Sequence, residues 1–134
     1  MPPLHLLHPL RYLKGLDKVI GHSIVHPTWQ RTRPDDPNDT HAGWVFRSCG
    51  DQPLTNINGV GSFECDDALI PDTVNHAKMV RELYEMSGDM DGPFTTPILW
   101  DKETKGIVSN ESIDILRILN SDFNSIAEQP EVDL

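Results

Sequence analysis

The side chains best suited to bind a ligand lie where the sequence predicts the start of a helix. The run Ser109-Asn110-Glu111-Ser112 stands directly before or within an apolar pattern at helical spacing, whose predicted buried positions are Ile113, Leu116, Ile118 and Leu119. Free backbone N–H groups and the helix dipole favour an anion at such a start, and Glu111 could meet an ammonium group beside it. The alternative is a plain capping cluster, which stabilises a helix by about 1 kcal/mol. The residues alone leave both interpretations open.

The chain has two cysteines, Cys49 and Cys65, and they form no Cys-x-x-Cys pair. Two thiols are too few for a disulfide framework and fit a reducing compartment better than a secreted protein. A single bridge between them stays open. Both cysteines fall in a long predicted loop, and the simplest expectation is a pair of free, partly exposed thiols.

We expect no metal site. His22 and His26 are four residues apart, but on a predicted strand this spacing separates them by about 13 Å. Asp35, Asp36 and Asp39 lack the glycine and the distal glutamate of a calcium loop, which favours a solvated acidic turn.

Composition excludes two classes of partner. The 134 residues carry 11 Lys and Arg against 21 Asp and Glu, a formal net charge of −10, and the basic residues are not clustered. A nucleic acid is bound through clustered Lys and Arg, so we expect no nucleic-acid partner. We expect no membrane span either, because no apolar run approaches the roughly 20 residues that a spanning helix needs.

The first half of the chain is predicted to contain a helix, a strand and a long loop. Apolar spacing predicts a helix over 6–13 that Gly15 ends, followed by a β-branched strand from Val19 to Val25. Prolines and glycines without periodicity then predict one long loop excursion over 28–71.

The second half is predicted to hold two helices and a hairpin. Asp72 or Thr73 caps the first helix, whose buried side is Val74, Ala77, Val80, Leu83 and Tyr84 and whose solvated side pairs Lys78 with Glu82 and Arg81 with Glu85. A strand headed by Pro97 runs to Trp100, a polar turn covers 101–106, and Ile107-Val108 is a short strand before the last helix. The fold class is therefore α/β, with an unpacked acidic tail over 124–134.

Several segments resemble glutathionyl-hydroquinone reductases, the xi or omega-like class of glutathione transferases. The similar segments are Lys14-Gly15-Leu16-Asp17-Lys18-Val19-Ile20, Ser23-Ile24-Val25-His26-Pro27, Gly43-Trp44-Val45-Phe46, 95–102 and 107–112. Together they cover residues from about Arg11 to Asn124. The resemblance implies the thioredoxin-like N-terminal domain of that family, and glutathione as its substrate, with no metal.

The resemblance also implies a glutathione site. In it, Pro97 follows a cis peptide bond that exposes the backbone of Thr96 to the tripeptide, and cis bonds are a feature of proline. Trp44 lines the pocket, while the helix start at Glu111 and Ser112 holds the γ-glutamyl carboxylate and ammonium. Thr96 stands where this family more often has Val, although pairing through the backbone does not depend on the side chain.

The chain departs from the family where the chemistry is done. The family uses a cysteine in a Cys-Pro-Trp-Ala motif to attack the glutathione of a glutathionyl-hydroquinone, and a second glutathione resolves the mixed disulfide. This sequence has no Cys-Pro, Pro93 replaces a basic residue, and none of its residues is expected to belong to the family's large helical C-terminal domain. Whether the chain is an enzyme is therefore left open, with a non-catalytic glutathione-binding remnant or an interaction domain as the alternative.

Residues 1–124 are expected to form a partial thioredoxin-like domain that lacks its first strand, and 125–134 its acidic tail. The missing strand would leave unpaired edges, which predicts low stability of the chain alone and pairing with a second copy as a homodimer. The expected partners are glutathione and quinone conjugates. We expect a cytoplasmic protein, and an organelle is the alternative because 1–16 carry no acidic residue.

Overall fold

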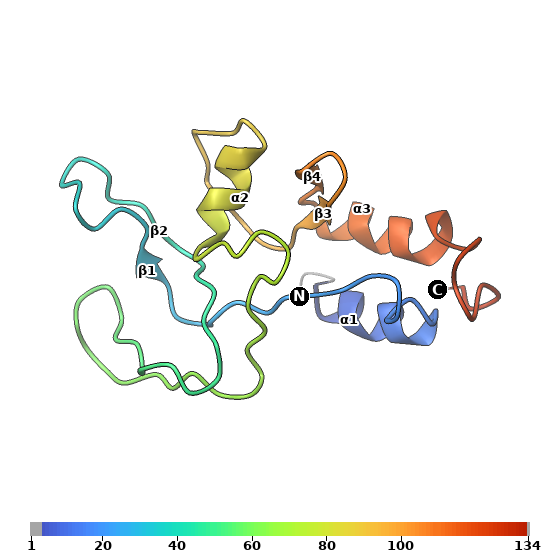
Figure 1. Ribbon diagram of the computed structural model, residues 1–134, viewed down its shortest axis with the longest axis horizontal. Helices are drawn as coiled ribbons and strands as arrows, with labels where there is room; N and C mark the ends of the chain where they lie inside the picture. The colour runs from blue at the N-terminus through green and yellow to red at the C-terminus, as the bar shows by residue number, and fades with distance from the viewer. Residues whose placement is uncertain (1–3, 134) are drawn as a thin grey trace. The chain divides into compact units, whose positions relative to one another are not determined.

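The structure is a computed structural model that describes residues 4–133, and it shows a small mixed α/β fold with short strands (Figure 1). The elements in chain order are α1 Leu4–Leu13, β1 Gln30–Arg31, β2 Ala42–Gly43, α2 Val80–Met86, β3 Leu99–Asp101, β4 Gly106–Ser109 and α3 Ser112–Arg117, which continues as the π-helical turn η1 Ile118–Asp122. They belong to two compact units. The first unit holds the described residues up to Gly21, with Pro97–Trp100 and those from Val108 onward; the second holds His22–Thr96 and Asp101–Ile107.

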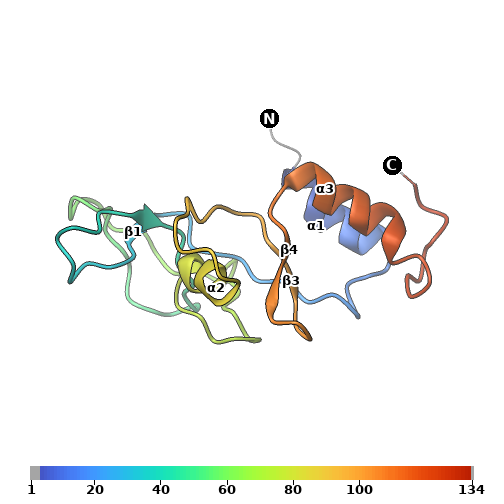
Figure 2. The same ribbon diagram turned by 90° about the horizontal axis from the view of Figure 1, so that it is seen from above.

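The core of the first unit lies between α1 and α3, which lie side by side in Figure 1 and overlap when seen from above in Figure 2. Its fully buried side chains are Leu10, Leu16, Ile115 and Leu119, and Leu99 packs against them. The helix expected over 6–13 is confirmed. It ends at Leu13 and is followed by a turn in which Gly15 has a φ of 66°, a conformation that glycine adopts without a steric penalty.

The buried side of α3 differs from the prediction at one position. Ile113 was expected in the core but is 52% exposed, while Ile115, four residues before the buried Leu119, takes its place. The helix begins at Ser112, so the i, i+4 pair Ile115 and Leu119 faces the core with α1. Leu116 and Ile118 are half-buried.

The C-terminal stretch is not the unpacked tail that we expected. The Lys14 ammonium is buried and donates hydrogen bonds to the carbonyl oxygens of Pro130 (3.1 Å) and Val132 (2.8 Å). The Gln129 N–H donates back to the Lys14 carbonyl at 3.0 Å. A buried ammonium needs acceptors, and here the C-terminal backbone supplies them.

The prediction of a strand from Val19 to Val25 is wrong. Residues 17–19 form a turn, and the Arg11 guanidinium takes up the carbonyl oxygens of Asp17 and Ile20. Only Ile24 pairs, in an isolated antiparallel bridge to Ile70. The Arg11 side chain thus bonds carbonyl oxygens that would otherwise be free to accept hydrogen bonds from a neighbouring strand. A run of β-branched residues does not reveal such a competing donor.

Helix α2 begins later than predicted, at Val80 rather than near Asp72. The Asp72 carboxylate accepts N–H bonds from Val74, Asn75 and Ala77, which closes a turn instead of a helix. The helix start is fixed by Glu82, whose carboxylate accepts the N–H groups of Lys78 and Met79 at 2.7 and 2.8 Å.

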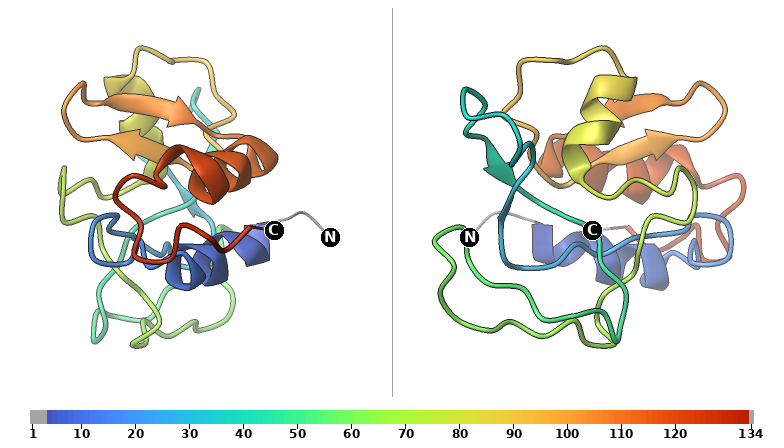
Figure 3. Two further views of the ribbon diagram at one scale, coloured as in Figure 1. Left: turned by 90° about the vertical axis from the view of Figure 1, so that its right-hand side faces the viewer. Right: turned by 60° about the vertical axis from the view of Figure 1, so that its left-hand side comes forward.

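The predicted hairpin before the last helix is confirmed as strands β3 and β4, seen side by side in Figure 3. Asp101 shapes its turn by accepting the N–H groups of Glu103 and Thr104. The other sheet is the two-residue pair β1 and β2, antiparallel, with Gln30 opposite Gly43. Across residues 4–133, every helix is too short or too polar to cross a membrane.

Candidate functional site

The five predicted site residues are divided between the two units. Trp44 and Thr96 belong to the second unit, whereas Pro97, Glu111 and Ser112 belong to the first.

Trp44 lines a hollow of about 200 Å³ within the second unit. The indole ring of Trp29 stands edge-on to that of Trp44, with 5.6 Å between ring centroids. The hollow is lined by Trp29, His41, Ala42, Gly43, Trp44, Pro93, Phe94 and Thr95. Aromatic walls with a few polar groups are the usual lining of a small-molecule site. Trp44, which the family resemblance places in the pocket wall, and Thr95 therefore border the same hollow.

The backbone of Trp44 is held by the start of α2. The Val80 N–H donates to the Trp44 carbonyl at 3.0 Å, and Val45 pairs with Met79 in an antiparallel bridge. Val45 and Val80 are both buried. The wall of the hollow is thus fixed to the helix at the point where Glu82 caps it.

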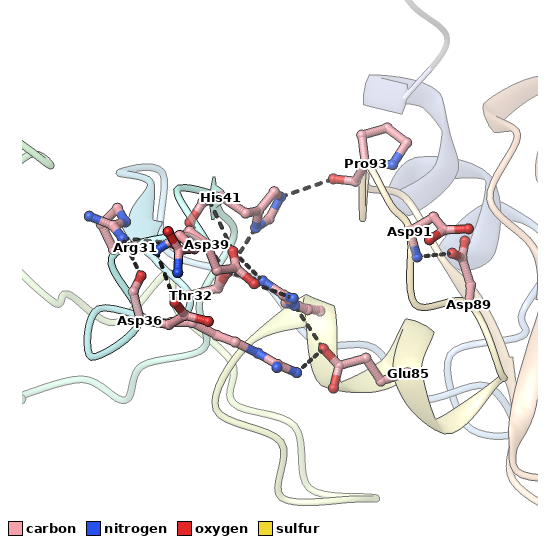
Figure 4. Close-up of polar contacts among 12 residues, drawn as sticks. Arg31, Thr32, Asp36, Asp39, His41, Glu85, Asp89, Asp91 and Pro93 are labelled. Atoms are coloured by element: carbon pink, nitrogen blue, oxygen red, sulfur yellow. Dashed lines mark hydrogen bonds and ion pairs between the residues drawn. The ribbon is translucent and has the colours of Figure 1, made fainter.

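His41 joins two sides of the hollow. Its Nδ1 lies 2.8 Å from the Thr32 hydroxyl and its Nε2 lies 3.1 Å from the Pro93 carbonyl, as Figure 4 shows. A carbonyl only accepts, so Nε2 donates the proton of its hydrogen bond to Pro93. The ring also stands edge-on to Phe94 at 5.0 Å.

Arg81 is the charged centre of the polar network that reaches His41 through Thr32. It is buried, and its guanidinium donates to both carboxylate oxygens of Asp39 (2.9 and 2.6 Å), to Glu85 (2.7 Å) and to the Thr32 hydroxyl (3.1 Å). It also lies over the Phe94 ring, 5.0 Å from the centroid. Hydrogen bonding from Arg81 lowers the pKa of Asp39 to about 2.

Sequence reasoning placed Arg81 on a solvated helix face with Glu85. The pair with Glu85 is present, but the prediction of a solvated Arg81 is wrong, because the loop that carries Asp39 covers it. Asp39 was interpreted as part of a solvated acidic turn. Nothing in the local pattern of either segment signals a contact 42 residues away.

Tyr84 fixes the backbone next to the predicted Thr96. Its hydroxyl donates to the Thr95 carbonyl at 2.6 Å, and its ring stands edge-on to Phe94. The expectation of a cis bond before Pro97 is wrong: in the described chain the cis bond is Gly92–Pro93. The cis and trans forms of an X–Pro bond differ by only about 0.5–1 kcal/mol, so the surroundings decide between them.

Glu111 stands at the N-cap of α3, as expected, and is exposed. Its N–H donates to the Ser109 hydroxyl at 3.1 Å, and its carbonyl accepts the Ile115 N–H at 2.9 Å. In the described chain its carboxylate caps no backbone N–H of the helix. The Glu111 side chain therefore does not cap the helix, while Ser109 of the same cluster does accept a backbone N–H at this end.

The histidines and cysteines have mostly structural surroundings. His26 is buried, with Nε2 3.0 Å from the Glu64 carbonyl and Nδ1 accepting the Thr28 N–H. Cys49 is exposed but Cys65 is buried, so the expectation of exposure fails for Cys65. Within residues 4–133, no three His, Cys, Asp or Glu side chains gather as a metal site would require.

Comparison with curated proteins finds relatives of one kind. The chain is 32% identical over 130 residues to a glutathionyl-hydroquinone reductase of Sphingobium chlorophenolicum, a match that covers 96% of this chain and 33% of the relative. It is 29% identical over 126 residues to a glutathionyl-hydroquinone reductase of Escherichia coli, covering 93% and 30%. The chain thus spans about a third of the length of the curated relatives it matches. No protein-family model matches it.

Solved structures similar to this chain come from the same family as the curated relatives. The xi glutathione transferase of Saccharomyces cerevisiae in complex with glutathione superposes with a TM-score of 0.71 at 31% identity, covering 98% of this chain and 40% of that one. The glutathione-bound transferase homologue of Escherichia coli gives a TM-score of 0.63 at 28% identity, covering 95% and 34%. With the sequence matches, these likenesses show that the chain belongs to the family of glutathionyl-hydroquinone reductases and xi or omega-like glutathione transferases.

Proposed function

We propose that the chain binds glutathione and represents the glutathione-binding part of a glutathionyl-hydroquinone reductase. The observation that carries the proposal is Trp44 in the wall of an aromatic hollow beside Thr95, in a chain similar to two glutathione-bound transferases. Glutathione is an extended tripeptide with a thiol, two carboxylates and an ammonium group. A site for it needs an apolar wall, a backbone edge and a charged end.

The predicted residues supply these three elements. Trp44 offers the apolar wall, and the backbone at Thr96 and Pro97 offers the edge that pairs with the peptide bonds of the ligand. Glu111 offers a carboxylate for the γ-glutamyl ammonium, and Ser112 offers the first turn of α3 for the γ-glutamyl carboxylate. The exposed Glu111 side chain makes none of the caps that would occupy it within its own helix.

For the complete protein we propose the reaction of the relatives, glutathione-dependent reduction of glutathionyl-hydroquinones through a cysteine thiol. The printed sequence contains no Cys followed by Pro, and its cysteines precede Gly50 and Asp66. A specific observation therefore favours a second candidate for the chain as given, a glutathione-binding module without turnover. In both cases we propose a partial thioredoxin-like domain without its first strand, and glutathione as the ligand.

Binding of reduced glutathione to the purified chain tests the proposal. We expect saturable binding in titration calorimetry that Glu111→Gln weakens about tenfold or more, the loss of one charge-assisted hydrogen bond. Trp44→Ala should weaken binding as well. Glu131→Gln, a matched change at another exposed glutamate, should leave it unchanged. Equal binding by Glu111→Gln and Glu131→Gln would refute the site, and no binding by the folded parent chain would refute the function.

Turnover separates the two candidates. The chain is mixed with a glutathionyl-hydroquinone and excess glutathione, and release of the hydroquinone is followed by chromatography. Binding without release supports the module without turnover. Release that persists in a double Cys49→Ser, Cys65→Ser variant would show that the reaction does not use a cysteine of this chain.

A further inference from the structure

The two cysteines lie on segments that the fold pairs with each other. The chain runs outward after Phe46 and returns before Asp66, the green segment of Figure 1. Midway, Leu54 and Phe63 exchange two backbone hydrogen bonds of 2.9 and 2.8 Å in an antiparallel bridge. Nearer the tip, the Asn56 N–H donates to the Val60 carbonyl at 2.9 Å.

The two segments also contact each other at the cysteines. The Gly50 N–H donates to the Cys65 carbonyl at 3.0 Å, and the Cys65 thiol donates to the Gln52 carbonyl at 3.6 Å. Standard peptide dimensions then keep the Cα atoms of Cys49 and Cys65 within about 8 Å of each other. A disulfide needs a Cα separation of about 4.4–6.8 Å, so the two Cα atoms need to approach by at most about 1 Å. The Cys65 thiol must also leave the Gln52 carbonyl and turn toward Cys49.

The Cys49 side of the pair has room to make such a shift. Residues 48–53 are all exposed. Among the described residues, no atom outside its chain neighbours lies within 4 Å of the point where a Cβ of Gly50 would stand. Gly50 also has a φ of 89°, a conformation that its lack of a side chain permits. Cys65, by contrast, is buried and held at its carbonyl and its thiol.

The two thiols differ in reactivity. Cys49 is exposed, so a small disulfide in solution can reach its sulfur. Burial raises the pKa of the Cys65 thiol, and the nearby Asp51 carboxylate raises it further, so less of Cys65 than of an ordinary thiol is present as the reactive thiolate. The order of events follows from this difference: Cys49 reacts first, and Cys65 second.

We propose that Cys49 and Cys65 are a redox pair that a small disulfide such as glutathione disulfide oxidises to an intramolecular bridge. The Cys49 thiolate attacks one sulfur of glutathione disulfide, forming a mixed disulfide and releasing one glutathione thiolate. Cys65 then gives its proton to solvent and attacks the Cys49 sulfur. The internal disulfide forms and the second glutathione leaves, so that two cysteine thiols are oxidised and one glutathione disulfide is reduced to two glutathione molecules.

This pair is independent of the proposed glutathione site, and mass spectrometry of the full chain tests it. The reduced protein is incubated with glutathione disulfide and quenched with acid over time. We expect a transient species carrying one glutathionyl group, followed by the parent mass less two hydrogens. The second step should speed up about tenfold per pH unit below the pKa of Cys65, because only the thiolate attacks.

Peptide mapping locates the bridge. Trypsin leaves both cysteines in the single peptide 48–78, because no Lys or Arg lies between Arg47 and Lys78. Cleavage after Glu64, the one glutamate of that peptide, then separates Cys49 from Cys65. The two fragments should stay joined until a reductant is added.

Two variants keep the test falsifiable. Cys65→Ser should stop at the mixed disulfide, and Cys49→Ser should resist glutathione disulfide when folded but react in urea. If the parent chain stops at the mixed disulfide as Cys65→Ser does, the pair is not within reach and the proposal fails. A disulfide-linked dimer on a non-reducing gel in place of the internal bridge overturns it equally.

Discussion

Arg81 and Asp39 form a bidentate ion pair in which each of the two terminal guanidinium nitrogens donates to one carboxylate oxygen, at 2.9 and 2.6 Å. The pair fastens the loop after β1 to helix α2, and Thr32 and His41 extend it to Pro93 at the edge of the hollow that Trp44 lines. Since bidentate pairing fixes direction as well as distance, this contact orients the loop that carries one wall of the candidate site.

Acid should weaken the fold through Asp39. Its folded pKa of about 2 lies below the ordinary value of 3.8, because Arg81 hydrogen-bonds the carboxylate. A lowered folded pKa contributes stability above the unfolded pKa and loses it as the pH falls from about 4 to 2. Asp39→Asn should therefore show a shallower decline of the free energy of unfolding over this range. Urea titrations at each pH, with Asp35→Asn as the exposed control, measure it; equal declines in Asp39→Asn and the parent would contradict the assignment.

Replacing Arg81 should cost far more than replacing a neighbouring surface arginine. Arg81→Met removes the ion-pair partner of Asp39, which keeps only the His41 N–H, and it removes the donor to the Thr32 hydroxyl. We expect a loss of about 2 kcal/mol or more in the free energy of unfolding. Arg33→Met removes only an exposed pair with Glu85 and should cost less than about 1 kcal/mol. Urea unfolding followed by tryptophan fluorescence measures both. Similar losses in the two variants would show that burial of Arg81 does not matter.

Lys14 should hold the C-terminal segment in place. Lys14→Met keeps the apolar stem but removes the donors to Pro130 and Val132, so amide hydrogen exchange over 129–133 should accelerate and stability should fall by about 1–3 kcal/mol. The control is Lys18→Met, which breaks an exposed pair with Glu128 and should cost less than about 1 kcal/mol. Unchanged exchange in Lys14→Met would mean that the segment is held by other contacts.

The core of the first unit should respond to Ile115 and not to Ile113. Ile115→Ala empties a buried position between α1 and α3 and should destabilise the chain by about 2–4 kcal/mol. Ile113 is half exposed, so Ile113→Ala should cost less than about 1 kcal/mol. Thermal unfolding of both variants shows which side of α3 is buried. A larger loss of stability in Ile113→Ala than in Ile115→Ala would mean that Ile113 lies in the core, as the sequence predicts.

The sequence by itself determined the features that depend on neighbouring residues and on family motifs. Gly15 marks the end of α1 because a left-handed φ suits glycine, and the polar run 101–106 marks the hairpin turn. The motifs at 43–46, 95–102 and 107–112 indicate the family. Each of these signals is local, so it survives without knowledge of the rest of the fold.

Only the tertiary structure decided where side chains satisfy distant backbone groups. Arg11 takes the carbonyls that a strand after Gly15 would have used, and Asp72 takes the N–H groups of an earlier helix turn. Lys14 meets carbonyls more than a hundred residues away, and Arg81 meets Asp39 across 42. Buried polar groups must find partners, and partners brought together by folding leave no periodicity in the sequence that could predict them.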